Sequence, residues 1–272
     1  MRDHNKAFCR LVAENFDPPA PVVEFGAFQV EGQEGFADLR GMFAGKAFVG
    51  CDMRPGPGVD RVEDVSAVDM PDDSVGAVLC IETFEHVFEV RRAFDEVYRI
   101  LAPGGIFVIT SPLNFRIHAY PDDYWRMTPS CLKRLMRPYA ARVVGSQGVR
   151  AFPHSVMAMG IKTTAPADFH DRARALVAGY DAFLAEAEAA VPLGQKIKRG
   201  LRMLYRSKGE RRAIAGYYQS EFSVEVAAEP VAVANAATGR ELRVDPAVGR
   251  SPLPTIHDAK GQRAWRHTSI VY

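Results

Sequence analysis

The segment from His118 to Thr128 concentrates side chains that could do acid–base chemistry. A histidine is its first residue, and carboxylates, aromatic rings and an arginine follow within eleven positions. An imidazole can accept a proton from a hydroxyl group near neutral pH, and a neighbouring carboxylate can orient the ring. We therefore interpret His118 as a general base that Asp122 or Asp123 orients. The alternative is a structural role, in which the segment holds its loop against the rest of the fold.

A second group of polar residues follows apolar runs of the chain. Asp52, Asp64 and Glu82 each come at the end of such a run or directly after it. The Asp52 carboxylate could accept hydrogen bonds from both hydroxyls of a ribose, and charge-assisted bonds contribute roughly 1.5–3 kcal/mol each. Asp64 and Val65 could supply an acceptor and a backbone N–H for an adenine ring. A surface acid or a helix cap is the alternative for Asp52.

The elements that must position these residues alternate along the chain. Short apolar runs predict strands over 21–25, 47–53, 59–65, 75–81, 106–110, 141–147 and 155–163. Helical spacing predicts helices over 6–15, 36–43, 90–101, 130–139 and 167–190. This alternation indicates an α/β domain with a mainly parallel sheet, which binds ligands at the carboxyl ends of its strands. The candidate residues above lie at those ends.

The turn after the first predicted strand argues against one class of cofactor. A strand, Gly26 and a following helix would allow close approach of a ligand to the backbone. A dinucleotide fingerprint requires G-x-G-x-x-G, but Ala27 and Phe28 follow Gly26 here. An NAD-dependent oxidoreductase or epimerase is therefore the less favoured function.

Composition sets wider bounds. The chain has 272 residues, of which 47% are hydrophobic and 25% charged, as in soluble globular proteins. Its four cysteines stand singly, so we expect neither a disulfide framework nor a metal site. No signal peptide and no apolar run long enough to span a membrane is recognised, so we expect a cytoplasmic protein.

The net charge of +1 conceals one cationic segment. Residues 195–212 contain eight basic side chains and one acidic side chain. An amphipathic cationic helix here could contact an anionic lipid or a phosphorylated carrier. A solvated helix face is the alternative, and nucleic acid is not favoured because no stacking platform accompanies the charge.

Read together, four motifs resemble those of class I S-adenosylmethionine-dependent methyltransferases, across roughly residues 20–163. They are Val22-Val23-Glu24-Phe25-Gly26, Gly50-Cys51-Asp52-Met53-Arg54-Pro55-Gly56-Pro57-Gly58-Val59-Asp60, Glu82-Thr83-Phe84-Glu85-His86-Val87 and Arg99-Ile100-Leu101-Ala102-Pro103-Gly104-Gly105. The closest resemblance is to a subset, similar to methyltransferase type 11, in which the first loop is poor in glycine.

The resemblance implies a Rossmann-like fold with a seven-stranded, mostly parallel sheet, helices on both faces and an antiparallel last strand. It implies S-adenosyl-L-methionine as cofactor, with its methionine part near Glu24, Gly26 and Glu82, its ribose at Asp52 and its adenine at Asp64 and Val65. The full set of expected cofactor-binding residues is Glu24, Gly26, Ala27, Asp52, Met53, Asp64, Val65 and Glu82. The expected acceptor-binding residues are His86, Tyr124 and Arg126.

The expected function is methyl transfer to an unidentified acceptor, such as a hydroxyl of a saccharide or small metabolite. We expect a methyltransferase domain over 1–165 and a C-terminal extension over 166–272, which would form a helical lid or acceptor-binding region followed by short strands. A non-catalytic binding or scaffold module with the same fold is the alternative.

Overall fold

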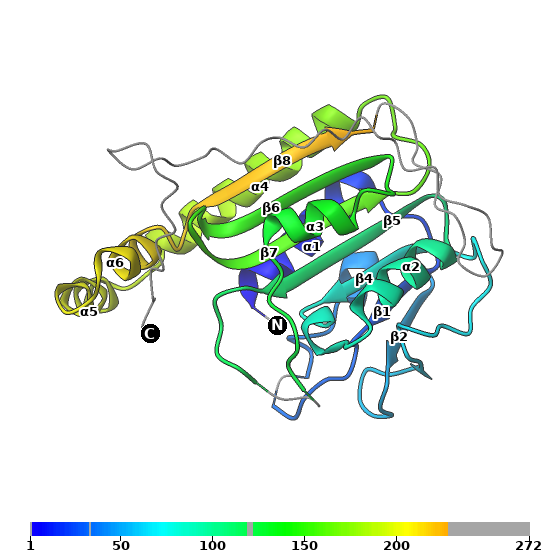
Figure 1. Ribbon diagram of the computed structural model, residues 1–272, viewed down its shortest axis with the longest axis horizontal. Helices are drawn as coiled ribbons and strands as arrows, with labels where there is room; N and C mark the ends of the chain where they lie inside the picture. The colour runs from blue at the N-terminus through cyan, green and yellow to red at the C-terminus, as the bar shows by residue number, and fades with distance from the viewer. Residues whose placement is uncertain (1, 33, 119–121, 228–272) are drawn as a thin grey trace, which may run out of the picture. The chain divides into compact units, whose positions relative to one another are not determined.

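The computed structural model describes residues 2–32, 34–118 and 122–227 (Figure 1). The short strands expected beyond residue 227 lie outside this part of the chain. Within it, one sheet forms the centre, and helices cover both of its faces.

The sheet has eight strands in the order β3-β2-β1-β4-β5-β7-β6-β8. β1 to β5 pair in parallel, whereas β7 runs antiparallel to β5 and β6. The seven-stranded sheet with one antiparallel strand is therefore confirmed, except that an eighth strand extends it. The strands are Val22–Phe25 (β1), Phe48–Asp52 (β2), Arg61–Val62 (β3), Val75–Ile81 (β4), Leu101–Pro112 (β5), Ala141–Val149 (β6), Phe152–Ile161 (β7) and Ser220–Val226 (β8).

The helices form two layers, because apolar side chains alternate between the faces of the strands. α1 (Asp3–Phe16) and α4 (Phe169–Ala189) pack on one face, and α2 (Val90–Ile100) and α3 (Pro129–Leu135) pack on the other (Figure 1). The remaining helices are the short 3-10 helices η1 (Arg40–Phe43) and η2 (Phe84–His86), and α5 (Leu193–Leu204) and α6 (Lys208–Ala215). Every residue of β4 is buried, which is why its sequence is a continuous apolar run.

Several predicted boundaries were wrong for local reasons. The helix expected over 36–43 is a single 3-10 turn, Arg40–Phe43. The third strand is reduced to Arg61–Val62 because the Asp64 carboxylate accepts hydrogen bonds from the N–H and hydroxyl of Ser66, which turns the chain. The fifth strand begins at Leu101, so the proline and glycines that follow lie inside it.

The basic segment forms two helices instead of one. Ser207 accepts a hydrogen bond from the N–H of Glu210, and the Glu210 side chain accepts one from the N–H of Ser207. This capping box begins a new helix at Lys208 and separates α6 from α5.

The described part of the C-terminal extension contributes to the sheet. β8 pairs antiparallel with β6, from Ala141 opposite Val226 to Gln147 opposite Ser220. Phe222 of β8 stacks on Phe8 of α1, with ring centroids 6.1 Å apart. The helical part of the extension is present as expected, whereas its first strand joins the main sheet. The domain boundary at 165/166 and a role in acceptor binding stay predictions.

Candidate active site

The turn after β1 requires glycine. Gly26 has φ +84°, and a Cβ there would lie 2.9 Å from Thr83 Cγ2 and still closer to the Thr83 hydroxyl. The N–H groups of Gly26 and Ala27 both donate to the Cys51 carbonyl, at 2.9 and 3.0 Å. The turn thereby contacts the strand ends on both sides of β1. No helix follows it directly, so the helix N-terminus expected beside the ligand is absent from this turn.

A phenylalanine joins the loops that follow β1 and β2. The Phe28 ring lies under the Arg54 guanidinium, 4.5 Å from ring centroid to Cζ, and against Gly56. The N–H of Gln29 donates to the Pro57 carbonyl at 2.9 Å. Side-chain packing therefore shapes this loop pair where a dinucleotide-binding loop would use glycine.

The residues predicted to bind ribose and adenine lie along the ends of β2 and β3. Asp52 is the last residue of β2, and its carboxylate accepts a hydrogen bond from the Arg54 N–H at 3.0 Å. Met53 is exposed next to it, and Val65 is buried. The Asp64 carboxylate is exposed but is bonded to Ser66, as described above.

The two glutamates predicted beside the methionine part differ in environment. Glu24 lies in β1 and is buried, and burial raises its pKa to about 8. Glu82 follows β4 in a left-handed conformation, with φ +52°. The Arg2 Nε donates to Glu82 Oε1 at 2.7 Å, and the Arg2 guanidinium also lies over the Phe115 ring. Sequence reasoning missed Arg2, because nothing local links residue 2 to residue 82.

Within the described part of the chain, the carboxylate bonded to His118 is that of Asp123. The His118 Nδ1 lies 3.0 Å from Asp123 Oδ2, which also accepts a hydrogen bond from the His118 N–H at 3.0 Å. Both terminal nitrogens of Arg126 donate to the Asp123 carboxylate. These bonds lower the pKa of Asp123 to about 2, and the hydrogen bonds from Arg126 are the largest cause. With the proton on Nδ1, the Nε2 atom of His118 carries the lone pair, as a base requires.

Asp122 does not contact the His118 ring as an orienting carboxylate would. Its side chain accepts a hydrogen bond from the Tyr124 hydroxyl at 2.9 Å, and its backbone carbonyl lies 2.6 Å from His86 Nδ1. The N–H of Tyr124 donates to the Glu85 carbonyl at 2.7 Å. Different residues of this segment thus fit the two interpretations. Tyr124 and Asp122 hold the loop, as a structural role requires, whereas Asp123 holds the His118 ring, as a functional role requires.

Glu85 and His86 adjoin this group from η2. The His86 and His118 rings lie 4.7 Å apart between centroids, in an edge-to-face arrangement. Glu85 is fully buried, and burial raises its pKa to about 8. Ser111 donates to Glu85 Oε2 at 3.4 Å. The order strand, then Glu-His, is the sequence signal that brings both side chains to the site.

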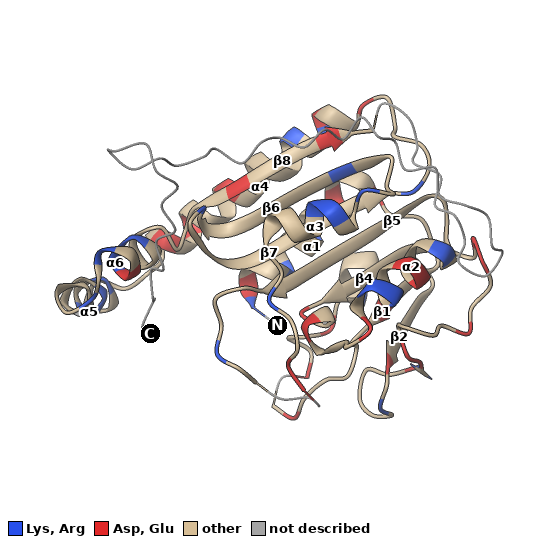
Figure 2. Cartoon of the chain, viewed as in Figure 1, with Lys and Arg blue, Asp and Glu red and all other residues tan. Residues whose placement is uncertain are grey.

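The charge and hydrogen-bonding groups at this edge of the sheet fit S-adenosylmethionine. Figure 2 shows acidic residues on the loops near β1 and β2, whereas α5 and α6 carry most of their charge as Lys and Arg. Carboxylates accept hydrogen bonds from ribose hydroxyls and attract the sulfonium and ammonium groups of the cofactor. The positive φ of Gly26 also brings bare backbone to the surface of the turn.

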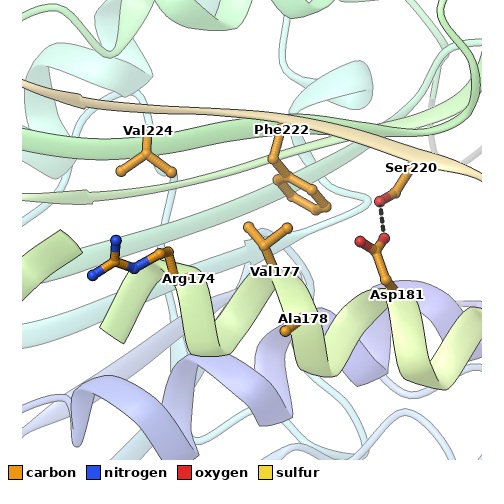
Figure 3. Close-up of a pocket in the computed structure, with 7 residues that line it drawn as sticks. All are labelled: Arg174, Val177, Ala178, Asp181, Ser220, Phe222 and Val224. Carbon is orange, nitrogen blue, oxygen red and sulfur yellow. Dashed lines mark hydrogen bonds between the residues drawn. The ribbon is translucent and has the colours of Figure 1, made fainter. Parts of the chain in front are cut away.

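A surface groove of about 520 Å³ lies elsewhere, between α4 and β8 (Figure 3). The Ser220 hydroxyl donates to Asp181 at one end of it. Its lining contains none of the predicted site residues: it is formed by Arg174, Val177, Ala178, Asp181, Ser220, Phe222 and Val224. We therefore do not assign the cofactor or the acceptor to it.

Comparisons with known proteins agree with the motifs. Residues 44–109 match the family described as "Methyltransferase domain". A demethylmenaquinone methyltransferase of Clavibacter sepedonicus is 34% identical over 104 residues, which are 35% of this chain and 42% of that protein. A probable S-adenosylmethionine-dependent methyltransferase of Mycolicibacterium smegmatis is 33% identical over 57 residues, which are 21% of this chain and 22% of that protein. The chain thus spans less than half the length of each of these relatives.

Among solved structures, the chain is similar to 1,6-didemethyltoxoflavin-N1-methyltransferase of Burkholderia thailandensis, which was solved with S-adenosylhomocysteine. The identity is 20%, the match covers 59% of this chain and 78% of that one, and the TM-score is 0.44. The matched residues include β2, β4, η2, α2 and most of β5, and three of the four motifs lie within them. These matches identify a methyltransferase domain that includes residues 44–109, in agreement with the motifs that resemble class I S-adenosylmethionine-dependent methyltransferases.

Proposed function

We propose that the chain transfers the methyl group of S-adenosylmethionine to a hydroxyl group of a small acceptor. The observation that carries this proposal is the continuity between the cofactor turn and the His118 group. Gly26 packs against Thr83, η2 follows Thr83 directly, and His86 at the end of η2 contacts His118. A cofactor at the Gly26 turn would therefore have a candidate base beside it.

The proposed step is an in-line displacement. The acceptor oxygen attacks the methyl carbon, the carbon–oxygen bond forms, and the bond from that carbon to sulfur breaks. The hydroxyl proton passes to His118 Nε2, and the products are a methyl ether and S-adenosylhomocysteine. Holding the two reactants in line supplies most of the rate enhancement, because bound reactants have already lost their translational freedom. Asp123 stabilises the imidazolium that forms, because its carboxylate is held ionised by Arg126.

The acceptor that we propose is a saccharide or a small metabolite with a comparable hydroxyl. Phe88 and Tyr124 have exposed rings 5.3 Å apart, and the exposed Trp125 ring lies beside Phe88. Flat apolar surfaces of this kind suit the C–H face of a sugar ring, and His86 and Arg126 offer polar contacts at their border.

We place this reaction in the cytoplasm, since all four cysteines are free thiols. No helix in the described part of the chain combines the length and apolar character needed to cross a bilayer.

A methyl-transfer screen tests the proposal. The protein is incubated with S-adenosylmethionine labelled in its methyl group and with fractions of a cell extract, and label is followed into small molecules and glycans. We expect label in a hydroxyl-bearing product with the native chain and a strong loss with His118→Ala. Unlabelled fractions throughout, from protein that binds the cofactor, would favour the non-catalytic module.

A further inference from the structure

Three side chains beside the proposed acceptor site offer metal-ligating atoms to one point. Ligand atoms of Glu85, His86 and His118 all lie within 4.8 Å of one another. Glu85 and His86 lie in η2, directly after β4, whereas His118 comes from the segment after β5. Two imidazoles and one carboxylate are a donor set that proteins use for zinc and for ferrous iron with open coordination positions.

The surroundings of both histidines match those of metal ligands. His86 Nδ1 is bonded to the Asp122 carbonyl, and His118 Nδ1 is bonded to the Asp123 carboxylate. A ligating histidine characteristically donates its second ring N–H to such a carbonyl or carboxylate, which fixes the tautomer and the ring. Both rings therefore keep Nε2 for a ligand. The Arg126 pair with Asp123 holds this outer shell in place.

Glu85 gives an independent indication. Its side chain is fully buried, and its Oε1 has no hydrogen-bond partner among the described residues. That oxygen lies 3.9 Å from His86 Nε2. A buried carboxyl oxygen without a partner is unfavourable, so its place in the structure calls for an explanation. A cation beside it would supply one.

We propose that Glu85, His86 and His118 bind one divalent transition-metal ion of the Zn²⁺ type. Ligand bonds of about 2.0–2.2 Å around a tetrahedral ion place the donor atoms roughly 3.4 Å apart, so the side chains close by about 1 Å on binding. The fourth position takes the acceptor oxygen, an assignment that rests on the proposed function. His118 Nε2 cannot hold the ion and a proton together. The role of His118 as a base therefore belongs to the metal-free chain, and in the metal-bound chain the coordinated acceptor loses its proton to water. The ion promotes that loss because it lowers the pKa of a coordinated hydroxyl.

Cobalt binding tests this site without any assay of activity. Protein freed of metal with a chelator is titrated with Co²⁺, and its visible absorption is recorded. We expect one saturable equivalent that Zn²⁺ displaces, at least tenfold weaker binding in Glu85→Gln, His86→Gln and His118→Gln, and a smaller loss in Asp123→Asn. His170→Gln, at an exposed histidine of α4, is the matched control and should bind as the native chain does.

The outcomes separate this inference from the proposed function. Binding of S-adenosylhomocysteine is measured on every variant, which also shows that each has folded. Absent or unsaturable Co²⁺ binding, or equal binding in all variants, would overturn the metal site and leave the proposed cofactor untouched.

Independently of the metal site, α5 presents its apolar side to solvent. Leu193, Ile197, Leu201 and Leu204 share one helix face, and their exposed fractions run from 54% to 73%. Tyr205, directly after the helix, is also exposed. An ordinary surface helix buries its apolar face, whereas α5 leaves its apolar face exposed.

A polar residue of α5, Arg199, contacts the neighbouring elements. Arg199 pairs with Glu188 of α4 at 3.4 Å, and its guanidinium lies over the Tyr218 ring. Other cations of the same segment are exposed: Lys198 on α5 and Lys208, Arg211 and Arg212 on α6. Figure 2 shows the Lys and Arg segments of α5 and α6 in blue.

We infer that α5 docks on the surface of an anionic lipid bilayer. The apolar face would enter the headgroup region, and the exposed cations would contact lipid phosphates, whose negative charge attracts them. The combination of exposed leucines with exposed lysines and arginines fits a bilayer, which is both apolar and anionic. A soluble phosphorylated carrier would use the charges alone.

Vesicle sedimentation tests the lipid surface. We expect the protein to sediment with vesicles of phosphatidylglycerol and phosphatidylcholine, weakly with phosphatidylcholine alone, and less at high salt. Ile197→Ser/Leu201→Ser should reduce binding at least tenfold, whereas Phe152→Ser, at an exposed apolar residue of β7, should not. Equal binding of both variants, or no binding at all, would contradict the inference. So would binding that inorganic phosphate competes away and that the Ile197→Ser/Leu201→Ser substitutions leave unchanged.

Discussion

At the scale of single residues, the candidate base depends on a carboxylate that is itself held in place. Asp123 is bonded to His118 on one side and to Arg126 on the other, whereas Asp122 points to Tyr124. The histidine and an acidic partner were predictable from the sequence. The choice between two adjacent aspartates was not, because consecutive residues of a loop point in different directions and only the fold decides which one meets the ring.

Asp123→Asn should therefore lower turnover much more than Asp122→Asn. An amide at position 123 no longer favours the tautomer with the proton on Nδ1, and a positioned base contributes typically 10²–10⁴-fold to a rate. We expect a loss in that range in kcat with nearly unchanged affinity for S-adenosylmethionine. Steady-state kinetics measures kcat and calorimetry measures the affinity of both variants. Equal losses of kcat in the two variants would assign Asp122 and Asp123 a structural role.

Glu24 predicts a pH dependence of stability. Its pKa of about 8 in the folded chain lies above the ordinary value of 4.5, mainly through burial, although the charge of Arg40 opposes the shift. Between these values the folded state holds more protons than the unfolded state, so this residue's contribution to stability is lost as the pH rises through the window. Glu24→Gln removes the titrating group and therefore this pH-dependent loss of stability.

The expected gain of Glu24→Gln over the native chain grows from pH 5 to pH 8, by up to about 1.4 kcal/mol per pH unit. Urea denaturation at four pH values measures it. A difference that does not change with pH would show that the carboxyl group is ionised in the folded chain.

At the scale of elements, the turn after β1 combines a left-handed glycine with a close neighbour. Its position after an apolar run was predictable, because a strand-ending glycine is a local signal. The contact with Thr83 and the packing of Phe28 against Gly56 were not, since they join loops that are far apart in the sequence. The same limit applies to Arg2 and Glu82.

Two glycine substitutions separate backbone strain from that contact. Gly26 and Gly32 have similar left-handed φ values, +84° and +78°, but only Gly26 has a neighbour where a Cβ would lie. Alanine at either position costs about 1–2 kcal/mol of strain. Gly26→Ala should cost about 1–3 kcal/mol more through overpacking against Thr83. Urea denaturation compares them, and Thr83→Ala should restore part of the extra loss; equal losses would exclude the contact.

At the scale of the whole molecule, the described C-terminal helices and strand build on the sheet of the methyltransferase domain. β8 pairs along β6, and Phe222 packs against Phe8 and Tyr180. The alternation of strands and helices predicted the α/β sheet and its order of elements. The eighth strand was not assigned to the sheet, because its residues pair with a strand some eighty positions earlier and show only a weak local pattern.

Phe222→Ala should therefore destabilise the whole domain in one transition. Removal of a partly buried ring from this aromatic group costs about 2–4 kcal/mol, slightly less than the loss of a fully buried phenylalanine. Val226→Ala, at the exposed end of β8, is the control and should change stability little. Denaturation followed by circular dichroism tests this, and a separate early transition in Phe222→Ala would show that the extension unfolds alone.

Above all, we expect the carboxyl edge of the sheet to bind S-adenosylmethionine with Asp52 as a principal contact. Isothermal titration with S-adenosylhomocysteine tests it most directly. We expect one site per chain, no binding of NAD, at least tenfold weaker binding in Asp52→Ala, and unchanged binding in Asp95→Asn on the exposed face of α2. Binding of NAD instead, no binding of either, or an affinity that Asp52→Ala leaves unchanged would contradict the account.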